Sequence, residues 1–372
     1  MKIAIISPSQ NAYSETFIQA HKNRLAGTIH YLYGGYIPTD SEFTGRRVLP
    51  RGFWEKVIFN FKYYVAHKGL SKIEFALKLY LKKHKIQCVL AEYGITGGVV
   101  YKITRQLNIP LIVYFLGYDI SVKKVLETNK HAYQKMFAYA SFLLGVSKPI
   151  LERLKELGAE KEKLIYNPCA PDDMFFKVEH NTNQQKIFFA LGRFVDKKAP
   201  YYTIIAFNKV LKKYPEAKLV LAGAGPLLDV CINLVRYLGI QENVAFPGVI
   251  TPEKERVYMS KAVAFVQHSI TARNGDSEGT PVAVLEASAA GLPVISTLHA
   301  GIPDVIIHKK TGLLCPEHDY EQMAQNMIWI LENPDAAKKM GLEGRDNVIK
   351  NFSMESHINN LNKTIEKAVN NW

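Results

Sequence analysis

Short apolar segments alternate with helical patterns along nearly the whole chain, and this alternation limits the possible folds more than any other feature. Runs such as Leu111–Phe115 and Ala217–Ala222 have the length of buried strands, and Leu70–His84 and Ala199–Lys213 repeat apolar residues at helical spacing. Such alternation is typical of doubly wound parallel sheets and predicts an α/β fold. The other predicted strands are Ile3–Ile6, Gln87–Ala91, Lys186–Ala190, Asn243–Phe246, Ala262–Gln267 and Pro293–Ser296, and the other predicted helices are Phe53–Val65 and Pro281–Ala290.

The length and one polar stretch predict two domains. A chain of 372 residues corresponds to about two domains, and the polar stretch Lys177–Gln185 interrupts the pattern near its middle. We interpret this stretch as the linker between two Rossmann-like halves, at 1–176 and 177–352, with a C-terminal helix at 353–372 that packs back towards the first half. In open α/β sheets ligands bind beyond the carboxyl ends of the strands, so we expect the site in the cleft between the halves.

The positive charge of the chain is confined to its first half. Residues 1–171 hold 25 basic and 12 acidic residues, and the remainder holds 22 of each. Within residues 46–85, 11 basic residues are interleaved with aromatic ones such as Trp54 and Phe61. This pattern suits an anionic membrane surface, where aromatic rings lie among the head groups. A solvated helix face over core aromatics is an equal alternative, and the neutral second half argues against nucleic acid.

Cysteine spacing and hydropathy exclude several classes of protein. Cys88, Cys169, Cys231 and Cys315 show neither a Cys-x-x-Cys motif nor zinc-ligand spacing, which favours free thiols and a cytoplasmic location. No apolar run approaches the length of a membrane span, and the first residues resemble a strand more than a signal peptide. The segment Gly223–Leu228 lacks the third glycine of a dinucleotide fingerprint, so we reject an NAD enzyme.

Two basic residues follow the first strand of the second half. Gly192 allows a tight turn there, and Arg193 and Lys198 lie between the strand and the next helix. A guanidinium fork together with a lysine point charge suits the oxygens of a diphosphate. Basic loop residues are usually only solvated, so this signal is weak by itself.

A second cluster begins at Asp276 and carries more information. Thr280 is a suitable N-cap and Pro281 a suitable first helical residue, so a helix should direct its N-terminus towards the site. Glu278 precedes this cap, where it can reach sugar hydroxyls. Glu286 is the one charge in a run of small apolar residues and needs a partner, such as ribose hydroxyls or, alternatively, a buried salt bridge to Arg193 or Lys198.

Glu278 and Glu286 match the Glu-x7-Glu signature of the retaining family 4 glycosyltransferases, which have the GT-B fold. The stretch from Gln267 to Pro303 resembles the members that build bacterial surface polysaccharides. Further matches support the resemblance, which is loosest in residues 20–85. They are Ser14–Ile18, Gly117–Asp119, Gly145–Ser147, Gly192-Arg193 with Lys198, Leu221–Pro226 and Gly312–Leu314.

The resemblance implies a hexosyltransferase that needs no cofactor or metal ion. Arg193 and Lys198 are expected to hold the donor diphosphate and Glu286 the ribose, while Glu278 and the backbone of Gly279 and Thr280 orient the donor sugar. The chain contains no Asp-x-Asp motif for a metal-bound diphosphate. The first half is expected to bind the acceptor, a glycan that is lipid-linked at the inner membrane face, where the enzyme would be peripheral.

The first half departs from the family at one position. Where the family has His-Gly-x-Asp, this chain has Leu116-Gly117-Tyr118-Asp119, and leucine forms no hydrogen bond. Asp119 remains as a catalytic candidate that contacts a sugar, or alternatively as a helix cap. Two other functions stay open, a soluble glycosyltransferase with a small free acceptor and a nucleotide-sugar-binding protein without activity.

Overall fold

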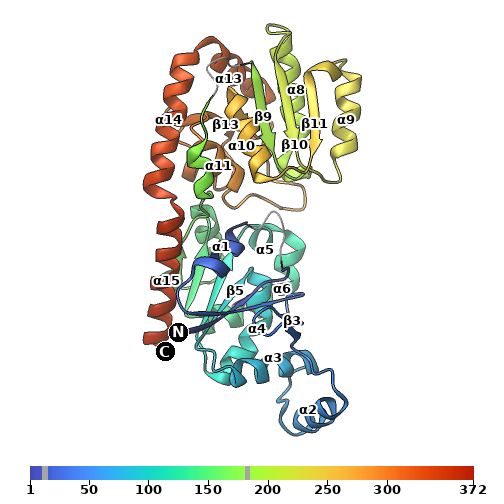
Figure 1. Cartoon of the computed structure of the whole chain (residues 1–372), viewed down its shortest axis with the longest axis vertical. Coiled ribbons are helices and arrows are strands. Elements are labelled where there is room, and N and C mark those ends of the chain that lie inside the picture. Colours follow the sequence, from blue (N-terminus) through green and yellow to red (C-terminus); the bar gives the residue numbers. More distant parts are fainter. Residues whose placement is uncertain (11–15, 181–184) are drawn as a thin grey trace. The chain divides into compact units, whose positions relative to one another are not determined.

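The computed structural model describes residues 1–10, 16–180 and 185–372, so residues 14 and 15 of the predicted Ser14–Ile18 motif and residues 181–184 of the predicted linker lie outside it. The chain divides into two compact units (Figure 1). The first unit comprises Met1–Asn167 and His357–Trp372, and the second comprises Pro168–Ser356.

The first unit is built on a sheet of eight strands in the order β4-β3-β2-β1-β5-β6-β7-β8. The six strands β2, β1, β5, β6, β7 and β8 pair in parallel. The short β3 and β4 extend one edge, and the β2–β3 and β3–β4 pairs are antiparallel. The strands are β1 (Lys2–Ile6), β2 (Thr28–Tyr33), β3 (Asp40–Ser41), β4 (Arg46–Arg47), β5 (Cys88–Glu92), β6 (Leu111–Phe115), β7 (Phe142–Gly145) and β8 (Leu164–Tyr166). The α-helices are α1 (Thr16–Arg24), α2 (Phe53–Ala66), α3 (Lys72–Lys83), α4 (Gly94–Leu107), α5 (Tyr118–Ser121), α6 (Lys123–Tyr139) and α7 (Lys148–Glu156), with a 3₁₀ turn η1 (Lys161–Lys163).

The second unit has six strands, all parallel, in the order β11-β10-β9-β12-β13-β14. The strands are β9 (Ile187–Leu191), β10 (Lys218–Ala222), β11 (Val244–Gly248), β12 (Ala264–Val266), β13 (Val294–Thr297) and β14 (Gly312–Cys315). The α-helices are α8 (Pro200–Leu211), α9 (Leu228–Tyr237), α10 (Pro252–Lys261), α11 (Val282–Ala289), α12 (Ile302–Val305), α13 (Tyr320–Glu332) and α14 (Pro334–Asn351), and the 3₁₀ turns are η2 (Asp173–Lys177), η3 (Asp196–Lys198) and η4 (Gln241–Asn243). The last helix, α15 (Met354–Asn370), begins in this unit and belongs to the first unit from His357 onward.

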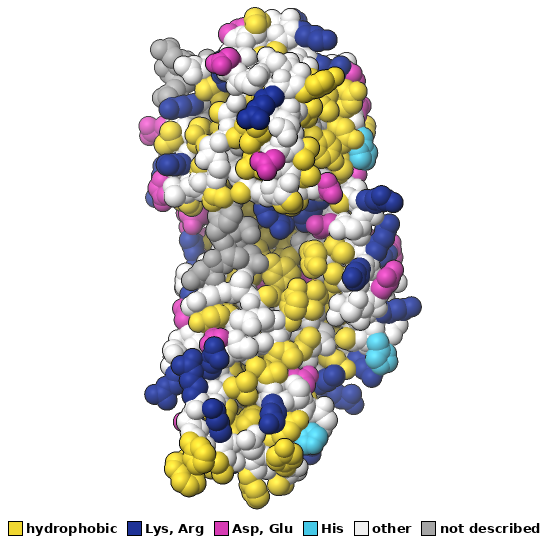
Figure 2. Space-filling model, turned by 90° about the vertical axis from the view of Figure 1, so that its right-hand side faces the viewer, with side chains coloured by type: hydrophobic (Ala, Val, Ile, Leu, Met, Phe, Trp, Pro, Cys, Tyr) yellow, Lys and Arg dark blue, Asp and Glu magenta, His cyan; other side chains and the backbone are white. Residues whose placement is uncertain are grey.

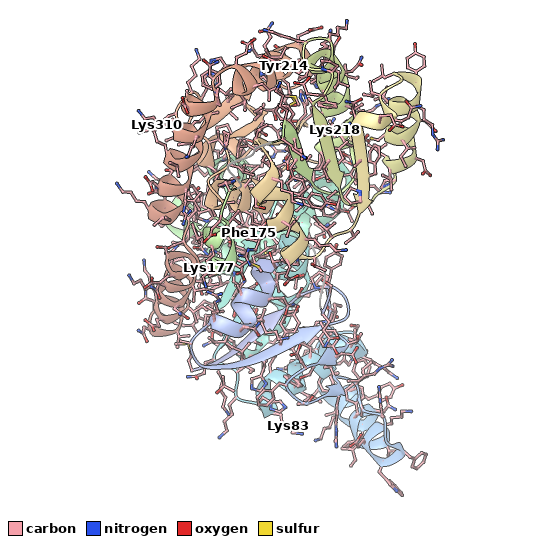
Figure 3. All side chains as sticks on the ribbon, turned by 45° about the horizontal axis from the view of Figure 1, so that its top comes forward. Lys83, Phe175, Lys177, Tyr214, Lys218 and Lys310 are labelled. Carbon is pink, nitrogen blue, oxygen red and sulfur yellow. The ribbon has the colours of Figure 1, made fainter. Side chains whose placement is uncertain are left out.

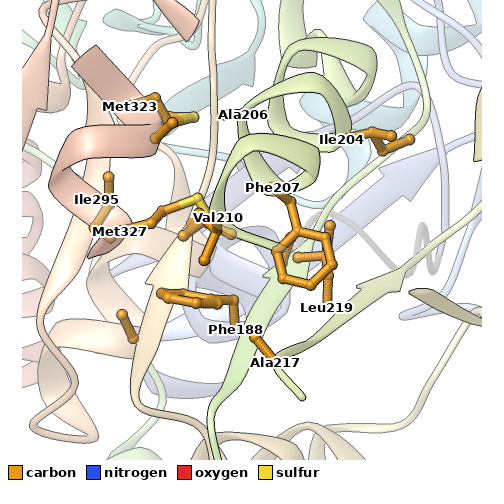
Figure 4. Close-up of a cluster of buried hydrophobic side chains, with 14 of the residues drawn as sticks. Phe188, Ile204, Ala206, Phe207, Val210, Ala217, Leu219, Ile295, Met323 and Met327 are labelled. Carbon is orange, nitrogen blue, oxygen red and sulfur yellow. The ribbon is translucent and has the colours of Figure 1, made fainter. Parts of the chain in front are cut away.

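Adjacent residues of β9 show why its sequence is continuously apolar. Phe188 points to one face of the sheet, against Phe207 of α8, and Phe189 points to the other, stacked on Tyr258 of α10. A parallel strand covered by helices on both faces must be apolar at successive positions. Figure 4 shows the core on the α8 face, where Met327 of α13 lies near Phe188 and Val210.

The structure divides the chain earlier than the sequence predicted. The sequence placed the boundary at 176/177, but the first unit ends at Asn167. The 3₁₀ turn η2, whose Phe175 and Lys177 are labelled in Figure 3, belongs to the second unit because Phe175 is buried there and the Phe176 carbonyl accepts a hydrogen bond from Arg345 Nη2 at 2.5 Å. At the other end, residues from His357 onward group with the first unit, where His357 Nε2 lies 2.7 Å from His21 Nε2.

Candidate active site

The strand order of the second unit fixes where its ligand site lies. The order reverses between β9, the first strand along the chain, and its neighbour β12. Ligands of open α/β sheets bind at such a switch point, beyond the carboxyl ends of the strands. Here the segments that leave β9 and β12 line one small pocket, to which Gly192, Arg193, Lys198 and Gln267 contribute. The predicted basic residues therefore lie at the switch point.

Two lysines connect the loop after β9 to the segment 276–278. Lys198 Nζ lies 2.9 Å from Glu278 Oε1 and donates a hydrogen bond to Gln267 Oε1 at 3.2 Å. Lys197, which the sequence reading did not single out, is buried, and its Nζ donates to Asp276 Oδ1 at 3.0 Å and to the Ser277 carbonyl at 3.1 Å. Two ion pairs thereby join the loop after β9 to the segment 276–278.

The site has one more positive charge than the acidic side chains neutralise. Lys197 is paired with Asp276 and Lys198 with Glu278, whereas Arg193 is exposed and forms no ion pair within the described residues. Burial lowers the pKa of Lys198, and Lys197 and Arg193 lower it further, against the opposing effect of Glu278. A bound anion would relieve this repulsion, so the arrangement favours a negatively charged ligand.

Glu278 is ionised although it is buried. Its exposed fraction is 7%, and burial alone would raise its pKa, but Lys198 and Lys197 outweigh this effect and hold the pKa at about 2. An ionised carboxylate only accepts hydrogen bonds. Glu278 therefore suits a ligand that presents hydroxyl groups.

His299 and Glu317 position the backbone of Glu278, and sequence reasoning missed this role. The Glu278 backbone N–H donates to His299 Nε2 at 3.0 Å, so the ring proton resides on Nδ1 and is donated to Glu317 Oε1 at 2.6 Å. The next carbonyl, of Gly279, accepts from the Gly301 N–H at 3.0 Å. A lone histidine before Ala300-Gly301 carried no sequence signal for such a contact.

The helix that follows begins one residue later than predicted. Pro281, with φ −63° and ψ 117°, takes the N-cap position, and α11 starts at Val282. The reason is that the Pro281 carbonyl already accepts the first helical hydrogen bond, from the Val284 N–H at 3.1 Å. Thr280 and Gly279 therefore lie in the extended segment before the helix, and Thr280 is not its cap.

Glu286 faces a second carboxyl group, Glu255 of α10. Both side chains are buried, and burial and the neighbouring carboxyl raise the pKa of Glu255 to about 10. Burial also raises the pKa of Glu286, to about 7, although the hydrogen bond from Glu255 opposes the rise. The raised pKa of Glu255 favours its protonated form beside Glu286. The alternative salt bridge from Glu286 to Arg193 or Lys198 is wrong within the described residues, because Lys198 pairs with Glu278.

Two glycines explain the segment that resembled a dinucleotide fingerprint. A Cβ on Gly223 (φ +129°) would lie 1.9 Å from the Gly192 carbonyl oxygen, and one on Gly225 (φ +155°) would lie 2.5 Å from that of Phe194. Glycine is therefore needed for the loop after β10 to pack against the loop after β9. The Phe194 N–H donates to the Ala224 carbonyl at 2.9 Å across this contact.

The comparison with known families covers this whole site. The family model "Glycosyl transferases group 1" matches residues 172–347, which include Arg193, Lys198, Glu278 and Glu286. The second unit is similar to group 1 glycosyltransferases over slightly less than half of the whole chain. This confirms the family resemblance drawn from the sequence.

Two relatives of the chain are named for polysaccharide biosynthesis. WcaL of Escherichia coli (strain K12), named as a colanic acid biosynthesis glycosyltransferase, is 29% identical over 244 residues, 64% of this chain and 60% of WcaL. The chain thus spans less than two thirds of that relative. AmsK of Erwinia amylovora, named as an amylovoran biosynthesis glycosyltransferase, is 27% identical over 283 residues, 75% of this chain and 69% of AmsK.

A solved structure extends the likeness of fold to both units of the chain. HepE of Anabaena, in complex with UDP, matches with a TM-score of 0.78 and 14% identity, and the match covers 100% of both chains. The predicted GT-B fold class is confirmed. In the parts of the chain that the structure describes, no group of three or more His, Cys, Asp or Glu side chains could hold a metal ion.

Asp119 lies in the first unit and holds its backbone. The side chain is fully buried and accepts three backbone N–H groups, from Gly94 at 2.7 Å, Leu116 at 3.1 Å and Gly117 at 3.0 Å. Burial nevertheless raises its pKa. Because both carboxyl oxygens are engaged within the protein, the geometry favours the alternative of a helix cap over contact with a sugar.

Proposed function

We propose that the protein transfers a hexose from a nucleotide-diphosphate donor to a glycan acceptor in surface polysaccharide biosynthesis, with retention of anomeric configuration and without a metal ion. The observation that carries the proposal is the Lys198–Glu278 pair, 2.9 Å apart, beside the exposed Arg193 at the switch point of the sheet. The names of WcaL and AmsK support a polysaccharide as the product.

The chemistry assigned to each side chain follows from its charge. When the bond between the sugar and the diphosphate breaks, negative charge grows on the leaving diphosphate, and Arg193 and Lys198 stabilise it. Glu278 accepts hydrogen bonds from donor-sugar hydroxyls, with the backbone of Gly279 and Thr280 beside it. Glu286 accepts from the ribose in its ionised form, which the raised pKa makes dependent on pH near 7, because an ionised carboxylate takes two hydroxyl groups at once.

Thermal unfolding with nucleotides tests the donor site. The protein is heated with UDP, GDP, ADP or CMP, and a nucleotide at about 100 times its dissociation constant should stabilise it by roughly 2.7 kcal/mol. We expect one nucleotide to raise Tm by a few degrees, an effect absent in Lys198→Ala and kept in Lys212→Ala, which removes an exposed lysine of the same unit. No shift with any nucleotide, or an equal shift in both variants, contradicts the assignment.

Turnover separates a transferase from a binding protein. Release of nucleotide from the matching nucleotide sugar is followed with the wild type and with Leu116→His, which restores the residue expected from the family. Release by the wild type supports the proposed reaction. Stabilisation by nucleotide without release, and gain of release in Leu116→His, would instead identify a nucleotide-sugar-binding protein that has lost activity.

The proposed place of action is a membrane surface, where a lipid-linked acceptor is found. The support is the excess of 25 basic over 12 acidic residues in residues 1–171. Among the described residues, no helix is both long and apolar enough to cross a membrane. Because the first half is basic, we propose peripheral attachment to the anionic inner leaflet. A protein that ignores anionic vesicles but turns over would be the soluble enzyme with a small free acceptor.

A further inference from the structure

A cavity of about 780 Å³ opens at the edge of the first unit, between β4, the segment 48–51, α2 and α3. Its lining divides into two chemical kinds. The basic side chains are Arg46, Arg47, Arg51, Lys62, Lys83 and His84, and the apolar side chains are Val48, Leu49, Ile58, Phe59, Ala76 and Leu79. The cavity therefore combines cationic groups with apolar surface, and it is separate from the candidate active site of the second unit.

The positive charge of this cavity is not neutralised by the protein. Glu55 is the one acidic residue in its lining, and its carboxylate accepts from the Gly52 N–H at 3.2 Å. Arg47 lies 3.9 Å from Asp40, and the other arginines and lysines of the lining form no ion pair within the described residues. The pKa of His84 is lowered by burial and then by Lys83 and Lys2, as expected beside uncompensated cations. Figure 3 labels Lys83 at the end of α3.

The neighbouring helix α2 exposes apolar side chains that the first unit does not cover. Phe59 is its one buried residue and packs on Phe75 of α3, with ring centres 5.8 Å apart. The exposed set is Phe53, Trp54, Val57, Ile58, Phe61, Tyr64 and Val65, and five of these have exposed fractions above 70%. Figure 2 shows hydrophobic side chains at the end of the first unit that carries α2, with Lys and Arg side chains beside them. Patches of this kind mark interaction surfaces.

We propose that the cavity binds the phosphate head group of an anionic phospholipid while the exposed side chains of α2 enter the interface of the same bilayer. This inference rests on the membrane attachment proposed above and names its binding site and its ligand class. Arginine forks bind phosphate oxygens, and each cation near an anionic leaflet strengthens attachment. The apolar lining receives the first part of the lipid chains.

A phospholipid accounts for both the basic cavity and the exposed apolar side chains of α2, whereas a soluble phosphate accounts for the basic cavity alone. Phe53, Trp54 and Phe61 gain nothing from an inorganic anion, because their exposed rings need an apolar partner. Aromatic and aliphatic residues beside basic ones are the pattern of helices that lie in a membrane interface. Charge and hydrophobicity on adjoining surfaces thus point to one amphiphilic ligand.

Vesicle sedimentation with charge-matched variants tests the proposal. Vesicles of phosphatidylcholine, with and without phosphatidylglycerol, are mixed with wild type, with the cavity variant Arg46→Gln/Arg51→Gln/Lys83→Gln, or with the control Lys124→Gln/Lys130→Gln/Lys135→Gln on α6. All six side chains are exposed. Each cation near the membrane surface contributes about fivefold to vesicle affinity. The cavity variant, which loses three cations, should therefore bind phosphatidylglycerol vesicles on the order of 100-fold more weakly than the wild type, and the affinity of the control should fall clearly less. Equal weakening of both, or wild-type binding by the cavity variant, overturns the proposal.

Trp54 reports insertion directly. Its fluorescence should shift to the blue on phosphatidylglycerol vesicles, and Trp54→Phe should abolish that shift although Trp329 and Trp372 remain. An unchanged spectrum overturns the insertion of α2. Inorganic phosphate or pyrophosphate that displaces the protein from vesicles at matched ionic strength would show a soluble-anion site and overturn the lipid assignment.

The nucleotide experiment keeps the two proposals apart. The cavity variant should retain the nucleotide-induced rise in Tm, because its substitutions lie in the first unit and the donor residues in the second. Loss of vesicle binding with an intact nucleotide response refers to the lipid site alone. An absent nucleotide response in the wild type, with selective vesicle binding, would refute the transferase assignment and leave the lipid site standing.

Discussion

Replacing Glu278 by glutamine should remove a large, pH-dependent contribution to the stability of the second unit. The pKa of Glu278 is about 2 in the folded protein against an ordinary value of 4.5. Because the folded-state pKa is the lower one, the contribution is fully present above 4.5 and is lost as the pH falls towards 2. Each unit of difference between the folded and unfolded pKa corresponds to about 1.4 kcal/mol. The unfolding free energy of the wild type should therefore exceed that of Glu278→Gln by about 3 kcal/mol at neutral pH.

The slope of this difference is the sharper test, because a general loss of packing would not depend on pH. Between about pH 5.5 and about pH 3.5, the difference in unfolding free energy between wild type and Glu278→Gln should shrink by about 1 kcal/mol. Urea denaturation measures it in a background with Trp54→Phe and Trp372→Phe, where Trp329 on α13 alone reports the second unit. Glu242→Gln, at an exposed carboxylate, is the control and should show no gap. A gap that stays constant with pH refutes the lysine-held carboxylate.

Three further variants test other contacts of the second unit. In the wild type, the raised pKa values of Glu255 and Glu286 make the unfolding free energy fall as the pH rises from about 5 to about 8. Glu255→Gln removes one of these carboxyl groups, so its unfolding free energy, measured by urea denaturation, should fall less over the same range. His299→Ala leaves the Glu278 N–H without its acceptor and should cost about 1–3 kcal/mol and weaken nucleotide binding in thermal shifts; unchanged nucleotide affinity would show that the contact does not position Glu278. Gly223→Ala places a Cβ 1.9 Å from a carbonyl oxygen and should cost more than Gly239→Ala, which has a positive φ but nothing within 4 Å and should cost only about 1–2 kcal/mol; equal costs by urea denaturation would argue against the close contact.

Buried strands could be read from the sequence, and short or mixed ones could not. The predicted strand Leu111–Phe115 agrees with β6 at both ends, and the other predicted strands begin and end within two residues of those observed. Most of their side chains are buried, as in β6 (Leu111–Phe115), so most of their positions are apolar. By contrast β2 (Thr28–Tyr33), which contains the buried His30, was not predicted. Nor were β7 and β14, which have four residues each, although the equally short β13 was.

The candidate site was predictable where one loop carries the chemistry and not where two distant segments create it. Arg193, Lys198 and Glu278 follow strands or precede a helix, so local sequence placed them at the carboxyl edge of the sheet. Glu255 lies among other charges on α10 and acquires its raised pKa only because the fold packs it against Glu286. No sequence pattern around Glu255 or Glu286 predicts that the two residues meet.

The two carboxylates of the Glu-x7-Glu pattern are in opposite electrostatic surroundings, and this difference gives each a distinct use. Glu278 faces two lysines and remains a fixed anion, which can only accept hydrogen bonds. Glu286 faces the carboxyl group of Glu255, and its pKa is raised. Glu278, by contrast, lies among the positive charges of Lys198 and Lys197, and its pKa is lowered. In the proposed reaction a change in pH near 7 therefore alters the ribose contact at Glu286 and leaves the sugar contact at Glu278 untouched. Nucleotide affinity should carry the pH dependence of the first, and selectivity for the sugar should not.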